Sequence, residues 1–281
     1  TLLKDISRVF APVLKNFTEP LYLQTTLTGN DEGMQFSNVK VNTKQKDLTI
    51  NAKGYISGLK DKYKLHVHFD VNRMTAQGDS KERIISHFPV KKFMMKQLDN
   101  LGTIGYIGTF DVLWKREQFA GLLITKPGNI NFSFALNENT KYVEGTVRTD
   151  SFELGQAMDM PDLKKVSCMA TFKFDISKPR TAIMRRKVGG KLPMGEVYAE
   201  VNDAKYKLIH VRNTVVSIKS NGAVAEGDVN IRGKRLDVLC TFSFTNTNEM
   251  NKIKIKPKLK FHGLLGGKKA KREEPEVSDA E

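Results

Sequence analysis

Residues 36–71 read FSNVKVNTKQKDLTINAKGYISGLKDKYKLHVHFDV and contain the clearest structural signal of the chain. Apolar side chains recur at mostly every second position in three runs, at residues 36–41, 48–52 and 65–71. A period of two places successive side chains on opposite sides of a β-strand. The turn signal SGLKD separates the last two runs. The stretch therefore predicts consecutive short strands that each have one apolar face.

The same alternation continues along the chain and predicts about fourteen strands. The further runs lie at residues 21–27, 103–115, 119–125, 130–136, 142–149, 166–176, 195–201, 214–219, 223–231, 236–245 and 252–261. Most connections are too short for crossover helices, so neighbours should pair antiparallel in a meander. Weakly similar units that restart at a glycine, as in GTVRTD and GDVNIR, favour an extended repetitive sheet over a compact barrel. We expect a mainly β fold, an extended curved antiparallel sheet forming a groove, with a few short amphipathic helices.

Three segments have helical rather than strand periodicity. Residues 1–20 space their apolar side chains as an amphipathic helix does. Within a β-groove domain of residues 21–262, helical insertions are expected near 80–101 and near 151–160. Ser80 is the expected N-cap of the first insertion, because serine hydroxyls accept hydrogen bonds from the first free amides of a helix.

The two ends of the chain give expectations about its context. Residues 263–281 lose all periodicity and become charged, which predicts a disordered tail. The chain begins at Thr1 without a methionine or a signal peptide. It also has no apolar run of about 18 residues, the length that a membrane-spanning helix requires. We therefore expect a piece of a longer protein, with its targeting segment upstream.

Composition limits the classes of function. The 281 residues are 40% hydrophobic, which is enough for a real core. The 46 Lys and Arg against 31 Asp and Glu give a net charge of +15, which favours anionic partners such as nucleic acid, membrane surfaces or lipid headgroups. Cys168 and Cys240 are far apart, each within a strand-like run, and are expected to be small core residues.

The sequence lacks the motifs of common catalytic sites. It contains no GxSxG, GxxxxGK[ST], HExxH or CxxC pattern. The glycines of GGK at 189–191 resemble a phosphate cradle only superficially, because no apolar strand precedes them. His66 and His68 share one strand face and could approach a metal, but the sequence shows no third ligand. We expect no enzyme, no cofactor and no metal site.

Nucleic-acid binding is the obvious interpretation of the positive charge, and the pattern of charges argues against it. Lys and Arg are spread over many strands, and no RNP-type or helix-turn-helix pattern is present. Five lysines alternate along residues 252–260. Their simplest role is a solvated outer face that protects a terminal sheet edge from aggregation. We therefore expect no nucleic-acid partner.

The apolar faces suggest a lipid partner. Many one-sided strands make a wide apolar surface, and the few short helices cannot cover all of it, so part of it should remain as a binding site. The side chains expected to line a lipid groove are Phe110, Val112, Trp114, Phe132, Phe134, Phe172, Phe174, Phe242 and Phe244. The cations expected to contact anionic headgroups are Lys252, Lys254, Lys256, Arg185 and Arg186.

Several stretches resemble one protein family. Residues 36–71 resemble the repeated β unit of AsmA/TamB-like envelope proteins. The runs KKFMMKQLDNLGTIGYIGTFDVLWKREQFAGLL, VEGTVRTDSFELGQ, MATFKFDISKPRTAIMRRKVGGKLPMGEV and VLCTFSFTNTNEMNKIKIKPKLKFH are similar to the C-terminal part of AsmA-family proteins of Bacteroidota. The resemblance covers nearly all of the chain except the tail.

This resemblance implies an elongated β-groove, an inner-membrane anchor upstream, and a periplasmic role in outer-membrane biogenesis and phospholipid transport between the membranes. It supplies no catalytic residues. The chain departs from the full family pattern because it lacks the anchor and most upstream repeats, so it cannot bridge two membranes alone. The alternative is a structural or scaffold domain of the envelope, whose apolar face is wholly buried and whose basic surface binds an anionic or protein partner.

Overall fold

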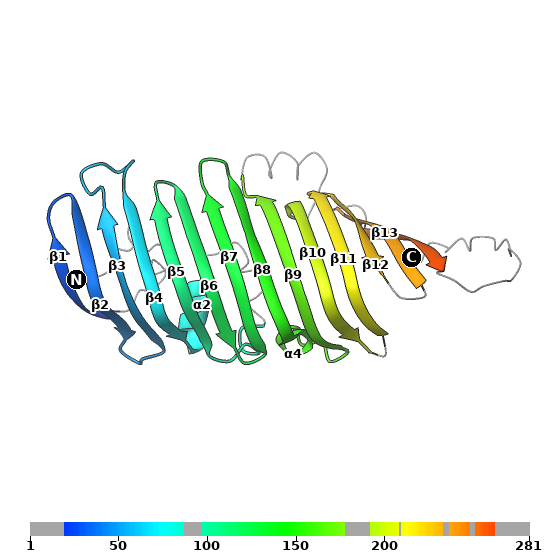
Figure 1. The fold of residues 1–281 in the computed structure, drawn as a ribbon, viewed down its shortest axis with the longest axis horizontal. Helices are drawn as coiled ribbons and strands as arrows, with labels where there is room; N and C mark the ends of the chain where they lie inside the picture. Colours follow the sequence, from blue (N-terminus) through cyan, green and yellow to red (C-terminus); the bar gives the residue numbers. More distant parts are fainter. Residues whose placement is uncertain are drawn as a thin grey trace, which may run out of the picture.

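The computed structural model describes residues 20–86, 97–177, 192–207, 209–232, 236–247 and 251–261. Fourteen strands form one sheet whose spatial order is the order of the sequence (Figure 1). Every neighbouring pair is antiparallel. The sheet is open, since β1 and β14 are its two edges. The predicted mainly β meander is confirmed.

The strands are 8 to 13 residues long, and their bounds lie close to the alternating runs of the sequence. They are β1 (Leu21–Gly29), β2 (Gly33–Thr43), β3 (Leu48–Ser57), β4 (His66–Ala76), β5 (Ile104–Leu113), β6 (Arg116–Thr125), β7 (Gly128–Asn137), β8 (Tyr142–Glu153), β9 (Leu163–Asp175), β10 (Met194–Tyr206), β11 (Ile209–Asn221), β12 (Val224–Ile231), β13 (Leu236–Asn246) and β14 (Asn251–Phe261).

Asparagine side chains close several of the hairpins. The Oδ1 atom of Asn30 accepts hydrogen bonds from the amides of Glu32 and Gly33, at 2.9 and 3.2 Å. Asn137 and Asn221 make the same pair of bonds in the β7–β8 and β11–β12 turns. An asparagine that bonds the backbone two and three residues ahead pre-forms a tight turn. These turns set the register of the strands that they connect.

Bulges bend several strands, and two of these bulges each contain a left-handed residue. β2 carries one extra residue relative to both of its neighbours near Asn38, and β8 carries one relative to β9 near Ser151. Both residues have a left-handed backbone, with φ of 55° and 53°. A bulge leaves one residue unpaired, bends its strand and increases the local twist. The bulges therefore contribute to the curvature that alternation alone does not specify.

Among the described residues, two short helices lie at the same ends of the strands, α2 (Gly78–Ile85) and α4 (Leu154–Met158) (Figure 1). They fall within the two predicted helical insertions. The expected N-cap is wrong, because Gln77 occupies that position and Ser80 lies inside α2. Three other expectations fall outside the described residues: the helix over most of 1–20, the middle of the 80–101 insertion, and the tail at 263–281.

A polar clamp holds α2 against the β2–β3 hairpin. The fully buried hydroxyl of Ser80 donates to Asp47 Oδ2 at 2.7 Å, and the Thr43 hydroxyl donates to Asp47 Oδ1. The buried Lys81 ammonium donates to the carbonyls of Leu98 and Gly102, at 2.9 and 3.1 Å. Each buried polar group thus has a partner, which removes the main cost of burying it.

Two of the apolar clusters lie where these helices meet the sheet. Ile84 of α2 packs against Leu48 and Ala76, while Ile85 packs against a cluster that contains Leu98 and Leu101. That cluster also contains Ile104, Phe152 and Ala157, which join β5, β8 and α4. Helical segments therefore cover one end of the apolar strand faces.

Acid should release this clamp. Burial opposes ionisation of Asp47, but the hydrogen bonds from Thr43 and Ser80 outweigh it and hold its pKa below the usual value. A depressed carboxylate pKa stabilises the fold above the unfolded-state pKa of about 3.9, and this contribution is lost as the pH falls through the folded-state pKa. We expect amide exchange in α2 to accelerate below about pH 4 while the central strands stay protected.

The variant Asp47→Ala should reproduce the acid effect at neutral pH. It removes the acceptor of the buried Thr43 and Ser80 hydroxyls, which should lower the free energy of unfolding by about 1–3 kcal/mol. Hydrogen exchange followed by mass spectrometry reports the change locally. Asp31→Ala is the control, because Asp31 makes only an exposed ion pair with Lys60. Equal protection of α2 in both variants would show that the clamp does not hold the helix.

Candidate functional site

One row of paired residues crosses the whole sheet, with one residue from each strand. Directly paired residues in an antiparallel sheet present their side chains to the same face. We call this set the central row, and the face that it occupies the apolar face. Its members in strand order are Leu27, Phe36, Gly54, Phe69, Phe110, Phe119, Phe134, Gly145, Phe172, Val197, Ile218, Gly227, Phe242 and Ile255.

A second row runs parallel to the central row, four or five residues along each strand, and also crosses all fourteen strands. The side chains of this second row are apolar except for two threonines and the hydroxyl group of one tyrosine. Its members are Leu23, Val41, Ile50, Met74, Tyr106, Leu123, Ile130, Thr149, Cys168, Val201, Thr214, Ile231, Val238 and Leu259. The apolar face is therefore continuous from one edge of the sheet to the other.

The two ends of the central row differ from its middle in exposure. Phe110 and Phe119 are each 8% exposed, whereas Leu27 on β1 is 50% and Ile255 on β14 is 58% exposed. Between Phe119 and Ile255 the row is partly exposed, as at Phe172 and Ile218. Full coverage by a second layer would bury these side chains. The apolar face thus stays partly open over the strands that follow β6.

Glycines in the central row receive the aromatic rings of the next strand. A Cβ atom built on Gly54 would lie 2.6 Å from a ring atom of Phe69, and the corresponding distances are 2.8 Å for Gly145 with Phe172 and 2.7 Å for Gly227. The ring opposite Gly227 belongs to Phe242 and is directly paired with it. A ring that lies over a paired glycine covers backbone that would otherwise face solvent. The same pairing of a glycine with an aromatic ring thus recurs at three places along the central row.

Gly145→Ala should destabilise the sheet by about 1–3 kcal/mol, the usual cost of an overpacked side chain. The new methyl group would meet the Phe172 ring and lie 2.3 Å from the Ser133 carbonyl oxygen. Chemical denaturation measures the loss. Thr146→Ala is the matched control, because Thr146 is the next residue, is exposed and points to the opposite face. An equal loss of stability in the Thr146→Ala control would show that contact with the Phe172 ring is not the cause.

Tyr106 anchors the buried part of the second row. Its hydroxyl donates to the carbonyl oxygens of Thr109 and Ala120, at 2.7 and 3.1 Å. Burial, with the nearby negative charge of Asp111, raises the pKa of this hydroxyl above its usual range. The phenol therefore remains a neutral donor, and its ring packs over Gly108 and Gly121. The side chains predicted to line the groove did not include Tyr106, although it lies in the predicted strand at residues 103–115.

Eight of the nine side chains predicted to line a groove lie on the apolar face. Phe110, Phe134, Phe172 and Phe242 belong to the central row, and the other four occupy the rows on either side: Val112, Phe132, Phe174 and Phe244. Trp114 is the exception, because β5 ends at Leu113. Its ring lies 5.0 Å from that of Tyr63, in the adjoining loops. Equivalent residues that the prediction omitted are Phe36, Phe69, Phe119, Val197 and Ile218.

The predicted headgroup cations do not line this face. Lys252, Lys254 and Lys256 pair with Thr245, Ser243 and Thr241, which alternate with Phe244 and Phe242 along β13. These lysines therefore lie on the opposite, polar face, and their contact with anionic headgroups stays a prediction. Alternation requires this outcome, because Ile253 and Ile255 occupy the apolar positions of β14. Arg185 and Arg186 lie outside the described residues.

Charges of alternating sign follow one another across the polar face. Lys173 Nζ lies 3.7 Å from Glu144 Oε2, and Lys219 Nζ lies 3.5 Å from Glu196 Oε2. These four residues occupy successive strands in one row, which continues to Glu226 on β12. A hollow of about 520 Å³ follows this row over β8 to β11. Much of the local positive charge is thus paired, which disfavours a continuous nucleic-acid surface here.

Comparison with known proteins finds no matching family model, curated protein or solved structure. Within the part of the chain that the structure describes, no helix is long and apolar enough to cross a membrane.

Proposed function

We propose that the apolar face binds the acyl chains of phospholipid or a similar lipid. The observation that carries the proposal is the central row, an apolar line across all fourteen strands that remains partly exposed after β6. At about 4.8 Å per strand the row is ~60 Å long. Soluble proteins seldom expose a continuous apolar surface of this extent unless it binds something.

The chemistry of the face suits a hydrocarbon ligand. Burying each methylene group contributes about 0.8 kcal/mol and requires no directed partner. The rows offer rings and branched side chains in near repetition, so neighbouring positions along them should be similar in energy. An acyl chain could then move from strand to strand without a large barrier. No bond is made or broken, so the proposal needs neither a catalytic residue nor a cofactor.

On this proposal the chain is a lipid-binding groove segment of an AsmA/TamB-like envelope protein. It would lie in the periplasm, held to the inner membrane by a segment upstream of Thr1, and take part in phospholipid transport between membranes during outer-membrane biogenesis. The support for this wider role is the sequence resemblance together with the open meander of one-sided strands.

A scaffold role is the second candidate, and the exposed edge favours it. On β14 the apolar face presents Ile253, Leu259 and Phe261, which are 64%, 58% and 73% exposed. Edge strands are also common sites at which another chain adds a strand. A partner that extends the sheet at β14 would bury these side chains and leave the function structural.

Native mass spectrometry of the protein purified from bacteria tests the proposed function. We expect phospholipid to remain bound after gentle ionisation and to be recovered by solvent extraction. After its lipid is removed, the protein should bind a fluorescent phospholipid, with up to one lipid molecule per protein chain. A lipid-free spectrum combined with no uptake of the probe would contradict lipid binding and favour the scaffold role.

A further inference from the structure

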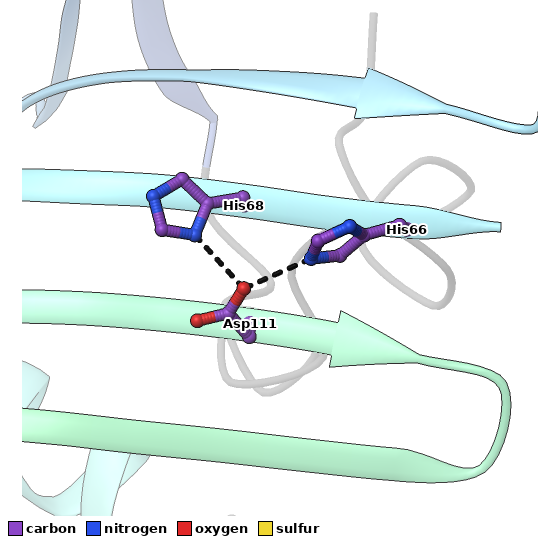
Figure 2. A group of neighbouring side chains, drawn as sticks. All are labelled: His66, His68 and Asp111. Atoms are coloured by element: carbon purple, nitrogen blue, oxygen red, sulfur yellow. Dashed lines mark hydrogen bonds and ion pairs between the residues drawn. The ribbon is translucent and has the colours of Figure 1, made fainter.

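Two histidines and one aspartate meet on the polar face of the sheet. His66 and His68 extend from β4, and Asp111 extends from β5 toward both rings (Figure 2). The Asp111 Oδ1 atom lies 2.9 Å from His66 Nε2 and 2.8 Å from His68 Nδ1. One ligand atom from each residue lies within 4.8 Å of the others. All three side chains are partly exposed, so an ion could enter from solvent.

Strand geometry brings these groups together. The spacing of two places both histidines on the same side of β4. His68 pairs directly with Asp111, and His66 pairs with Leu113 two residues further along β5. The carboxylate therefore lies between the two rings. The sequence contained no visible third ligand because Asp111 is 43 residues after His68 and only the β4–β5 register joins them.

The outer nitrogens of both rings also have polar neighbours. His68 Nε2 lies 3.4 Å from Asp70 Oδ1, and His66 Nδ1 lies 3.4 Å from the Tyr55 hydroxyl. Metal-binding imidazoles usually donate their second N–H to a carboxylate or similar acceptor, which orients the ring and raises its basicity. The Tyr55 ring stacks on His68 at 5.3 Å and meets His66 edge-on at 5.2 Å. The rings are thus held in place before an ion binds.

The donor set has a clear chemical preference. Two imidazole nitrogens and one carboxylate oxygen suit Zn²⁺ and other borderline divalent ions, and they leave the fourth position of a tetrahedron for water. An aspartate carboxylate is ordinarily ionised at neutral pH, which is the form that binds a metal.

We propose that His66, His68 and Asp111 bind a divalent transition-metal ion, with Zn²⁺ preferred. The ion would replace the shared hydrogen bonds at Asp111 Oδ1 and join β4 to β5. The site lies opposite Phe69 and Phe110 of the central row, so the ion and a ligand on the apolar face would not compete for the same surface. The site is therefore independent of the proposed function.

Isothermal titration of the untagged, chelator-treated full chain with ZnCl₂ tests the site. We expect one ion per chain. His68→Ala and Asp111→Asn should each weaken binding by at least tenfold, and Asp70→Asn by about 10- to 100-fold as an outer partner. The matched control is His210→Ala, which removes a histidine that bonds Asp203 at 2.6 Å beside Arg212 rather than beside a second histidine. The control should bind as the unaltered protein does.

A second measurement keeps the proposal testable if a variant fails to fold. Co²⁺ added to the unaltered protein should give the visible absorption of a four- or five-coordinate site, and Zn²⁺ should abolish it by displacement. Zn²⁺ should also raise the unfolding temperature of the unaltered protein, because the ion binds only when β4 and β5 are paired. Absence of one-to-one binding in the unaltered protein, or equal binding in the His68, Asp111 and His210 variants, would overturn the site.

Discussion

Ile218→Asp should remove most of the lipid from the apolar face. Ile218 lies in the partly exposed part of the central row, between Val197 and Gly227. A bound acyl chain would have to cover the new carboxylate, and removing a charge from water without a partner costs several kcal/mol. Since 1.4 kcal/mol is a factor of ten in affinity, we expect phospholipid binding to weaken by more than tenfold.

The matched control is Ser217→Asp, which adds the same charge one residue away on the polar face. Binding of a fluorescent phospholipid, measured beside thermal unfolding, separates lost affinity from lost structure. The control should bind lipid as the unaltered protein does. Equal binding by both variants, or an equal loss in both, would show that the apolar face is not the lipid surface.

Phe119→Ala should destabilise the protein by about 3–5 kcal/mol, the usual cost of deleting a buried aromatic side chain. The Phe119 ring centroid lies 4.8 Å from that of Phe110 and 6.3 Å from that of Phe134. The cavity would therefore interrupt three adjacent strands, β5 to β7, that connect the two halves of the sheet.

The control is Phe261→Ala, the same change at a side chain that is 73% exposed on the edge strand. It should alter the free energy of unfolding by no more than about 0.5 kcal/mol. Urea denaturation followed by circular dichroism gives both values. Similar losses for the two variants would mean that the centre of the row is not the core of the sheet.

Much of the fold could be predicted from alternation alone. The period of two in residues 36–71 predicted β2, β3 and β4, because a half-buried strand needs apolar side chains on one face only. The same signal predicted all the other strands and their antiparallel order. Alternation is a local property, so strands can be identified from it without knowing which distant residues they contact.

Local signals failed where a neighbouring element decides the outcome. Serine is a residue type that is common at N-caps, but α2 starts before Ser80, at Gly78. The Ser80 hydroxyl instead donates a hydrogen bond to Asp47, which lies in the β2–β3 hairpin. Trp114 follows the alternation of β5, but the strand turns after Leu113. In each case a tertiary contact or a turn, rather than the periodicity, places the residue.

The site could be predicted only in part. Phe110, Phe134, Phe172 and Phe242 were identified as inward residues, because each lies in a run in which apolar side chains recur at every second position. That they form one line depends on the register of thirteen pairings, which turn geometry and bulges set. For the same reason Asp111 could not be assigned to His66 and His68 in advance. Register is the information that a single sequence conveys least well.

Photo-crosslinking at two neighbouring aromatic positions distinguishes the two faces of the sheet as lipid surfaces. Benzoylphenylalanine can replace Phe172 on the apolar face or Tyr198 on the polar face, and the two positions lie on the paired strands β9 and β10. Irradiation of the protein in bacterial cells, followed by mass spectrometry, identifies what each probe touches. We expect phospholipid adducts at position 172 and none at 198. Adducts at 198 alone, or none at either position in folded protein, would contradict this expectation.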